Sequence, residues 1–89
     1  MPTVHLQIEG KVQGVFYRAT AKKMAEHLGL NGWVRNMPGG SVEATVNGTE
    51  EAVAAFIDWC KKGPPHAVVE NVVVTPKPDD GLRGFEVIK

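Results

Sequence analysis

The spacing of the apolar residues alternates along the chain between every second position and every third or fourth position. Thr3–Glu9 alternates apolar and polar side chains, a pattern typical of a strand with one buried face. From about Tyr17 to Leu28 the apolar residues lie three or four positions apart, and Gly29 is suited to end a helix in a left-handed conformation. These patterns predict a strand followed by a helix.

The next segments predict a hairpin and a second helix. Residues 32–36 and 41–47 have strand-like patterns and are joined by the turn-forming sequence Met-Pro-Gly-Gly. Thr49 can cap a helix whose first turn carries two glutamates, as the helix dipole prefers, and which ends at Gly63. The apolar stripe of this helix comprises Val53, Phe56, Ile57 and Cys60.

Two further strands complete the predicted order. Val68–Thr75 is rich in valine and is closed by Pro76 and Pro78, and a short strand at Phe85–Ile88 follows an Asp-Asp-Gly turn at residues 79–81. The order is strand, helix, strand, strand, helix, strand, strand. This order predicts a ferredoxin-like α+β sandwich, a βαββαβ core plus a short C-terminal strand, with two helices on one face of a mainly antiparallel sheet.

Composition and charge narrow the class of protein. The 89 residues suit a single domain, residues 1–89, and a formal net charge of zero argues against general attraction to nucleic acid or to an anionic membrane. Cys60 is the only cysteine, which excludes an intramolecular disulfide and a multi-cysteine zinc site. The first ten residues lack the charged start and apolar run of a secretory signal, and nowhere do eighteen apolar residues follow one another, so we expect neither a signal peptide nor a membrane span. We expect a soluble, cytoplasmic protein that is monomeric by default.

The segment GKVQGVFYR, Gly10 to Arg18, joins the first predicted strand to the first predicted helix. A glycine-flanked turn at a helix start exposes backbone N–H groups without intrahelical partners, and such groups bind anions. Arg18 can close over the same anion with a planar guanidinium suited to phosphate. Alternatively, the glycines only permit a tight turn and Arg18 is a solvated surface residue; spacing alone does not separate the two.

Other phosphate-binding motifs do not match this loop. A Walker loop needs Gly-Lys-Ser/Thr after its second glycine, whereas Gly14 leads into Val15 and Phe16. A cysteine-dependent phosphatase would need a cysteine where Val12 stands. Asn36, before the hairpin turn, can accept from and donate to a water molecule but cannot act as a strong base. Asn36 is alternatively a turn residue that bonds its own backbone.

Two stretches together resemble the signatures of the acylphosphatase family. GKVQGVFYR matches every specified position of Gly, any, Val-Gln-Gly-Val, any, aromatic, Arg. GWVRNMPGGSVEATVNG, residues 32–48, is similar to the second signature of the family, and the closing FEVIK is similar to its usual ending. The resemblance therefore covers nearly the whole chain.

The resemblance implies an enzyme of ferredoxin-like fold that hydrolyses acyl phosphates to a carboxylate and inorganic phosphate, without metal or cofactor. Arg18 would hold the phosphate and Asn36 would position the attacking water. The phosphate would also be bound by the loop backbone at Val12, Gln13, Gly14, Val15 and Phe16. The expected ligands are small acyl phosphates, inorganic phosphate and similar anions. Members often carry a hydroxyl residue after the asparagine, whereas this chain has Met37, with Ser41 as a partial substitute.

Rival functions have weaker support in the sequence. His5, His27 and His66 are scattered without ligand-like pairing, so we expect no metal site. An RNA-recognition domain of the same layout needs stacking aromatic residues, which the strands VHLQI and SVEATV lack. A non-catalytic anion-binding module would keep the loop and would not need Asn36. We therefore expect no nucleic-acid or membrane partner.

Overall fold

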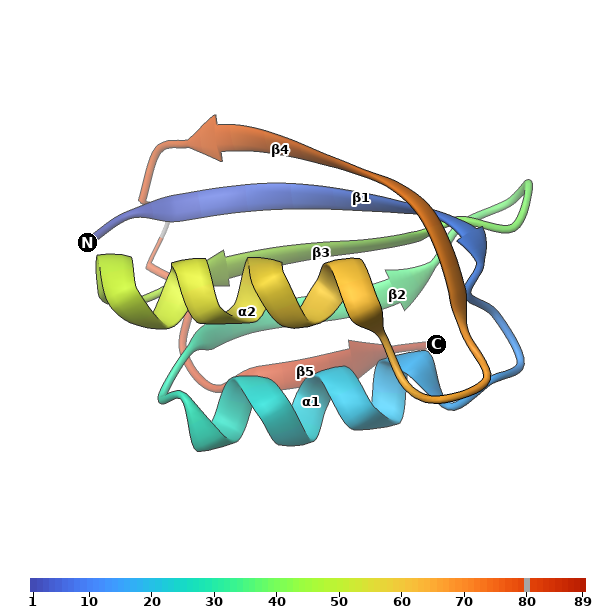
Figure 1. Cartoon of the computed structure of the whole chain (residues 1–89). Helices are drawn as coiled ribbons and strands as arrows, with labels where there is room; N and C mark the ends of the chain where they lie inside the picture. Colours follow the sequence, from blue (N-terminus) through green and yellow to red (C-terminus); the bar gives the residue numbers. More distant parts are fainter. Residues whose placement is uncertain (80) are drawn as a thin grey trace.

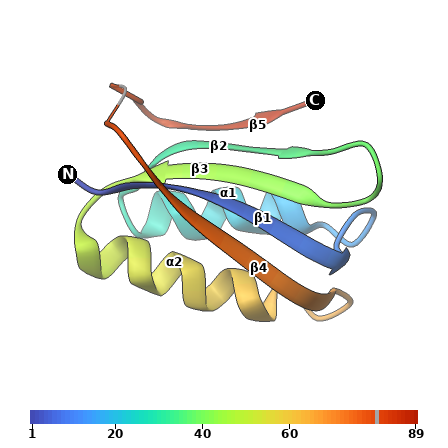
Figure 2. The same ribbon diagram turned by 90° about the horizontal axis from the view of Figure 1, so that it is seen from above.

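A five-stranded sheet with two helices on one face forms the molecule (Figures 1 and 2). The computed structural model describes residues 1–79 and 81–89. The elements are β1 (Thr3–Lys11), α1 (Tyr17–His27), β2 (Asn31–Asn36), β3 (Val42–Asn47), α2 (Glu50–Lys62), β4 (Val68–Lys77) and β5 (Phe85–Ile88). The strand order is β4-β1-β3-β2-β5, and only the pair of β2 and β5 is parallel. The predicted ferredoxin-like α+β fold is confirmed.

The ends of the helices follow from the residues predicted to set them. The backbone N–H of Ala52 donates to the Thr49 side chain over 3.1 Å, so Thr49 caps α2 as predicted. Gly63 follows the last residue of α2. Helix α1 ends at His27, and Gly29 beyond it has a φ of 72°, in the left-handed region.

Strand β4 is longer than its prolines predicted. Pro76 lies opposite Val4 and Lys77 lies opposite Thr3, so the prediction that Pro76 ends the strand was wrong. Strand β4 is at the edge of the sheet, where a proline is accommodated with its nitrogen facing away from the neighbouring strand. Of the predicted turn at 79–81, Asp80 lies outside the described residues, and the N–H of Gly81 donates to the Asp79 carboxylate over 3.0 Å.

The core lies between the helices and the sheet. Small side chains on α1, Ala21 and Ala25, are fully buried and let this helix approach the sheet closely. Helix α2 contributes Phe56 and Cys60, and burial raises the pKa of the Cys60 thiol to about 12. Cys60 is thus a packing residue, as its position on the apolar stripe predicted. The buried side chains from the sheet include Leu6, Ile8, Val34, Val42, Ala44, Val46 and Phe85.

No helix of the described chain covers the opposite face of the sheet (Figure 2). This face carries polar side chains, among them His5, Arg35 and Glu43. Glu43 of β3 is largely buried there by its neighbours; its carboxylate is 2.8 Å from His5 Nε2 and forms an ion pair with Arg35. Burial alone would raise the pKa of Glu43, but the hydrogen bonds from His5 and Arg35 outweigh it and lower the pKa below its ordinary value. The ionised carboxylate therefore stabilises the fold.

The Glu43 network gives a pH-dependent contribution to stability. Because the pKa of Glu43 is lower in the folded state, its contribution is present above the unfolded pKa and is lost as pH falls through the folded pKa. We expect Glu43→Gln to lower the free energy of unfolding by about 1–2 kcal/mol at pH 7. This difference should shrink toward zero near pH 2, where Glu43 is protonated and neutral, as the amide of the variant is at every pH. Urea denaturation at the two pH values measures it, and an equal difference at both would contradict the assignment.

Within the described residues, none of the helices combines the length and the apolar character that a membrane crossing requires.

Candidate active site

The loop between β1 and α1 exposes a series of backbone N–H groups. Within the described chain, no carbonyl or side chain accepts from the N–H groups of residues 13–19. Gly14 and Phe16 both have left-handed backbones, with φ values of 74° and 64°. A bend of this kind turns successive N–H groups toward one point and forms an anion-binding concavity. The loop geometry suits a phosphate group.

Phe16 carries the one strained backbone in this loop. It is the only non-glycine residue of positive φ among those described, and the residue is 80% exposed. A left-handed conformation costs an ordinary residue about 1 kcal/mol or more, so the surroundings must hold it in place. The N–H and the hydroxyl of Thr20 do so, donating to the Phe16 carbonyl over 3.1 and 2.8 Å.

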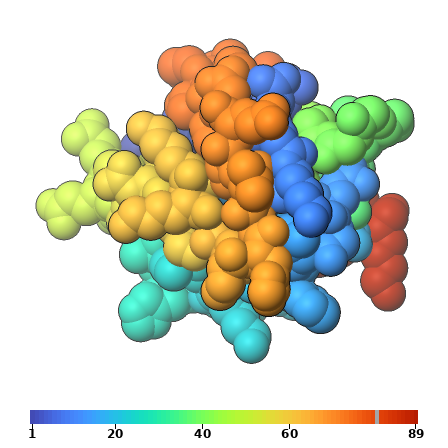
Figure 3. All heavy atoms as spheres, turned by 45° about the vertical axis from the view of Figure 1, so that its right-hand side comes forward, coloured from blue at the N-terminus to red at the C-terminus, as the bar shows by residue number. Residues whose placement is uncertain are grey.

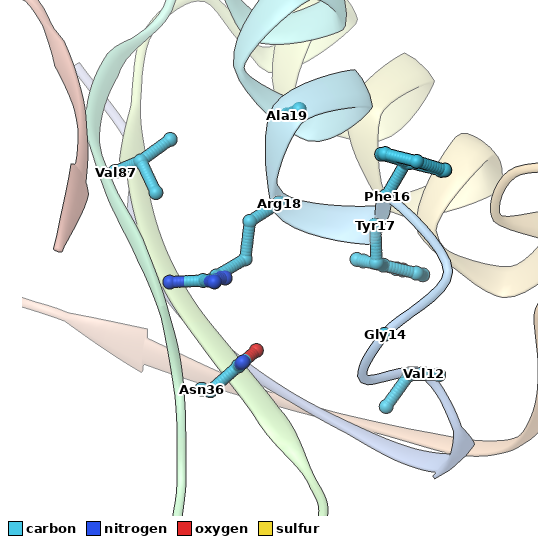
Figure 4. A pocket seen from close by; sticks show the side chains of 8 residues that line it. All are labelled: Val12, Gly14, Phe16, Tyr17, Arg18, Ala19, Asn36 and Val87. Carbon is cyan, nitrogen blue, oxygen red and sulfur yellow. The ribbon is translucent and has the colours of Figure 1, made fainter. Parts of the chain in front are cut away.

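The loop, α1, β2 and β5 line an open cavity of about 310 Å³ at one end of the sheet (Figure 4). The side chains of Arg18 and Asn36 point toward one another across it. The lining residues are Val12, Gly14, Phe16, Tyr17, Arg18, Ala19, Asn36 and Val87. Of the five loop residues predicted to bind phosphate, three line the cavity; Gln13 and Val15 do not.

Arg18 lies in the first turn of α1, as predicted, and is half-buried. Its Nη1 donates to the carbonyl of Ile88 in β5 over 3.2 Å, which holds the guanidinium at the cavity. None of the ion pairs formed by the described residues includes Arg18. The positive charge is therefore available to an anion. The contact with Ile88 has no local sequence signal, because the two residues are 70 positions apart.

Asn36 is the last residue of β2 and lies opposite Val42 of β3. Its backbone is part of the sheet, and its side-chain amide makes no hydrogen bond with the described residues. The alternative that Asn36 is a turn residue bonded to its own backbone is thus not observed. The amide faces the cavity with its donor and its acceptor both free (Figure 4).

The polar groups of Tyr17 and Ser41 are not available to a ligand in the cavity in the same way as those of Arg18 and Asn36. The Tyr17 hydroxyl donates to the Cys60 carbonyl over 2.7 Å, and burial raises the pKa of Tyr17 well above its usual value. This phenol therefore fixes the start of α1 against the end of α2. Ser41 lines a separate hollow with Gln7 and Pro38 and is not among the residues that line this cavity.

No metal cluster is apparent in the described part of the chain: no three His, Cys, Asp or Glu side chains gather where they could hold an ion. The cavity itself is lined by no carboxylate, imidazole or thiol among these residues. Any chemistry at this site therefore depends on hydrogen-bond donors, one guanidinium and one amide.

Comparison with known proteins shows the family of the chain. The sequence profile of the acylphosphatase family matches residues 4–87. The acylphosphatase of Thiobacillus denitrificans is 56% identical over 86 residues, 97% of this chain and 96% of that protein. The crystal structure of Bacillus subtilis acylphosphatase superposes with a TM-score of 0.97 at 31% identity and covers all of both chains. The protein is thus a hydrolase that acts on acid anhydrides.

Within that class, the chain belongs to the acylphosphatase family. The same fold also forms part of a larger protein, since the structure of HypF from T. kodakarensis matches with a TM-score of 0.86 at 33% identity. That match covers all of this chain and 12% of HypF.

Proposed function

We propose that the protein hydrolyses acyl phosphates without a metal, with the phosphate held by the loop and Arg18 and the attacking water positioned by Asn36. The observation that carries the proposal is the cavity lined by the loop, α1, β2 and β5, where the Arg18 guanidinium and the Asn36 amide meet. Among the described residues, the guanidinium has no ion-pair partner and the amide has no hydrogen-bond partner. Membership of the acylphosphatase family supports the substrate class.

The loop and Arg18 suit a phosphate that carries most of its charge on three peripheral oxygens. The N–H groups of residues 13–19 supply several donors on one side. Arg18 approaches from the first turn of α1 with the nitrogens that Ile88 does not use. Donors fixed before the substrate binds stabilise the charge of the transition state without reorganisation, and this is the main source of rate enhancement we infer here.

Asn36 suits the placement of a water molecule because its amide offers both an acceptor and a donor. The amide holds the water on the side of the phosphorus opposite the leaving group, as an in-line displacement requires. No side chain that could accept a proton near neutral pH lines the cavity among the described residues, and we therefore assign the proton of the water to a phosphate oxygen of the substrate. A flat pH profile of kcat between pH 5.5 and 8 would agree with this assignment.

The leaving group explains why so few side chains are sufficient. An acyl phosphate releases a carboxylate, whose conjugate acid has a pKa of about 4, so it departs without a general acid. A phosphate ester of an alcohol or a phenol releases a much stronger base and would need one. The cavity offers no such acid in the described chain, since Tyr17 is engaged by the Cys60 carbonyl.

The test compares benzoyl phosphate with phenyl phosphate in the presence of a chelator. We expect rapid hydrolysis of benzoyl phosphate, unaffected by the chelator, and hydrolysis of phenyl phosphate slower by at least about 10³-fold, because its leaving group has a pKa near 10. Loss of activity with the chelator, or similar rates for the two compounds, would contradict the proposal. An inactive protein that still binds phosphate would instead be an anion-binding module.

A further inference from the structure

Gln13 turns its side chain away from the cavity and onto the β2–β3 hairpin. Its Nε2 donates to the carbonyl of Met37 over 2.8 Å and to the carbonyl of Ser41 over 2.8 Å. A primary amide nitrogen has two hydrogens, so both are used on the hairpin. The N–H of Met37 also donates to Ser41 over 2.8 Å, so the two carbonyls belong to the residues that close the hairpin turn.

These contacts join two parts of the site that the sheet does not join directly. Gln13 lies between Val12 and Gly14 in the loop, and Met37 follows Asn36 directly. Strand β3 separates β1 from β2, so no backbone ladder connects the loop to the end of β2. Figure 3 shows the hairpin, in green, beside the blue segment that leads from β1 into the loop. The Gln13 amide is a direct connection between them.

We propose that Gln13 is a positioning residue that fixes the loop relative to Asn36, and thereby fixes the bound phosphorus relative to the attacking water. This inference rests on the proposed function, in which the loop holds the phosphate and Asn36 holds the water. Gln13 does so without touching the substrate, since its side chain does not line the cavity. A displacement of about 1 Å between reacting groups can lower a rate by about 10²-fold.

The chemistry of the contact requires an amide of this length. A glutamate has the same shape but, when ionised, presents only acceptors to two carbonyls. A methionine has similar length and bulk but no donor. Either replacement leaves the loop and the hairpin in place through their own strands and removes only the connection between them.

The experiment introduces Gln13→Met into the wild type and into Asn36→Ala, with Gln7→Met as the matched control. Gln7 is exposed on β1 and outside the site. With benzoyl phosphate, we expect Gln13→Met to lower kcat about 30-fold in the wild type, with KM and inhibition by inorganic phosphate changed less than about threefold. In the Asn36→Ala background the same change should lower kcat less than about threefold, because there is no positioned water left to misalign. Gln7→Met should match the wild type.

Two outcomes would overturn the inference. Equal losses of kcat in both backgrounds would mean that Gln13 acts independently of Asn36. A weakened phosphate inhibition with kcat unchanged would mean that Gln13 only shapes the loop. If Asn36→Ala alone leaves kcat unchanged, the proposed function of Asn36 fails instead, so the two failures are distinguishable.

Gln13→Glu provides a second measurement that does not depend on the methionine variant. Two carbonyl acceptors favour the protonated carboxyl, which can donate one hydrogen bond, so the kcat of this variant relative to the wild type should rise as pH falls from 7 to 5. A ratio that stays constant over this range would contradict the inference. Circular dichroism and thermal unfolding of each variant establish that the comparison is between folded proteins.

Discussion

We expect Arg18→Ala to lower kcat/KM for benzoyl phosphate by about 10³-fold or more. The variant would lose a charge-assisted contact that Arg18 is proposed to make with the transferred phosphoryl group throughout the reaction. Arg18 is the only charged side chain that lines the cavity among the described residues. In the proposed mechanism the guanidinium contacts the phosphate in both the bound substrate and the transition state, so we expect KM to rise and kcat to fall together. Inhibition by inorganic phosphate should be lost as well.

The fold should tolerate this change. Arg18 is half-buried and makes one side-chain hydrogen bond in the described structure, to the Ile88 carbonyl. Arg18→Lys keeps the charge but not the planar fork, and should recover only part of the activity. The matched control is Arg83→Ala, an exposed arginine outside the cavity, which should retain full activity. A kcat/KM for Arg18→Ala within tenfold of the wild type would refute the role given to Arg18.

Asn36→Ala has a different expected signature. We expect kcat to fall by about 10²–10³-fold, the cost of losing one positioning group in a preorganised site. Inhibition by inorganic phosphate should stay within about threefold of the wild type, because the loop and Arg18 remain. The measurement is the steady-state rate with benzoyl phosphate together with the phosphate inhibition constant.

The contrast between the two variants separates the two roles. The matched control for Asn36 is Asn71→Ala, an exposed asparagine of β4 whose amide donates to Glu9 over 3.1 Å, away from the cavity. If Asn36→Ala abolished phosphate inhibition and kcat were unaltered at saturation, Asn36 would be a phosphate ligand rather than a water ligand. The assignment of water activation would then have to be withdrawn.

Local patterns predicted most of the secondary structure. The alternation at Thr3–Glu9 and the cap at Thr49 each depend on residues within a few positions, and both appear in the structure. The prediction from Pro76 was wrong because a proline ends a strand only where its nitrogen would have to donate to a neighbouring strand. Strand β4 lies at the edge of the sheet, and the sequence does not show that position.

The arrangement of the candidate site was harder to predict from the sequence than the secondary structure. Loop and turn chemistry named Arg18 and Asn36 as candidates but left an alternative open for each, and only the resemblance to a family predicted that they act together. The structure places both at one cavity. The contact of Arg18 with Ile88 and the contacts of Gln13 with the hairpin join residues between 24 and 70 positions apart. Such contacts are decided by strand order and register, which periodicity does not encode. The left-handed backbone of Phe16 could not be predicted either, because bulky residues other than glycine rarely adopt a positive φ.

The parallel pairing of β5 with β2 has a kinetic consequence. The chain must complete β4 and return across the molecule before β5 can lie beside β2 and present the Ile88 carbonyl to Arg18 (Figure 1). The paired residues of β2 and β5 are 53 positions apart and those of β1 and β4 are 57 to 74 positions apart. Both pairings therefore pay the entropy of closing long loops and are expected to form after the helices and the β2–β3 hairpin. The helices can therefore be complete while Arg18 still lacks its anchor, and during refolding the return of activity would report the docking of this last strand.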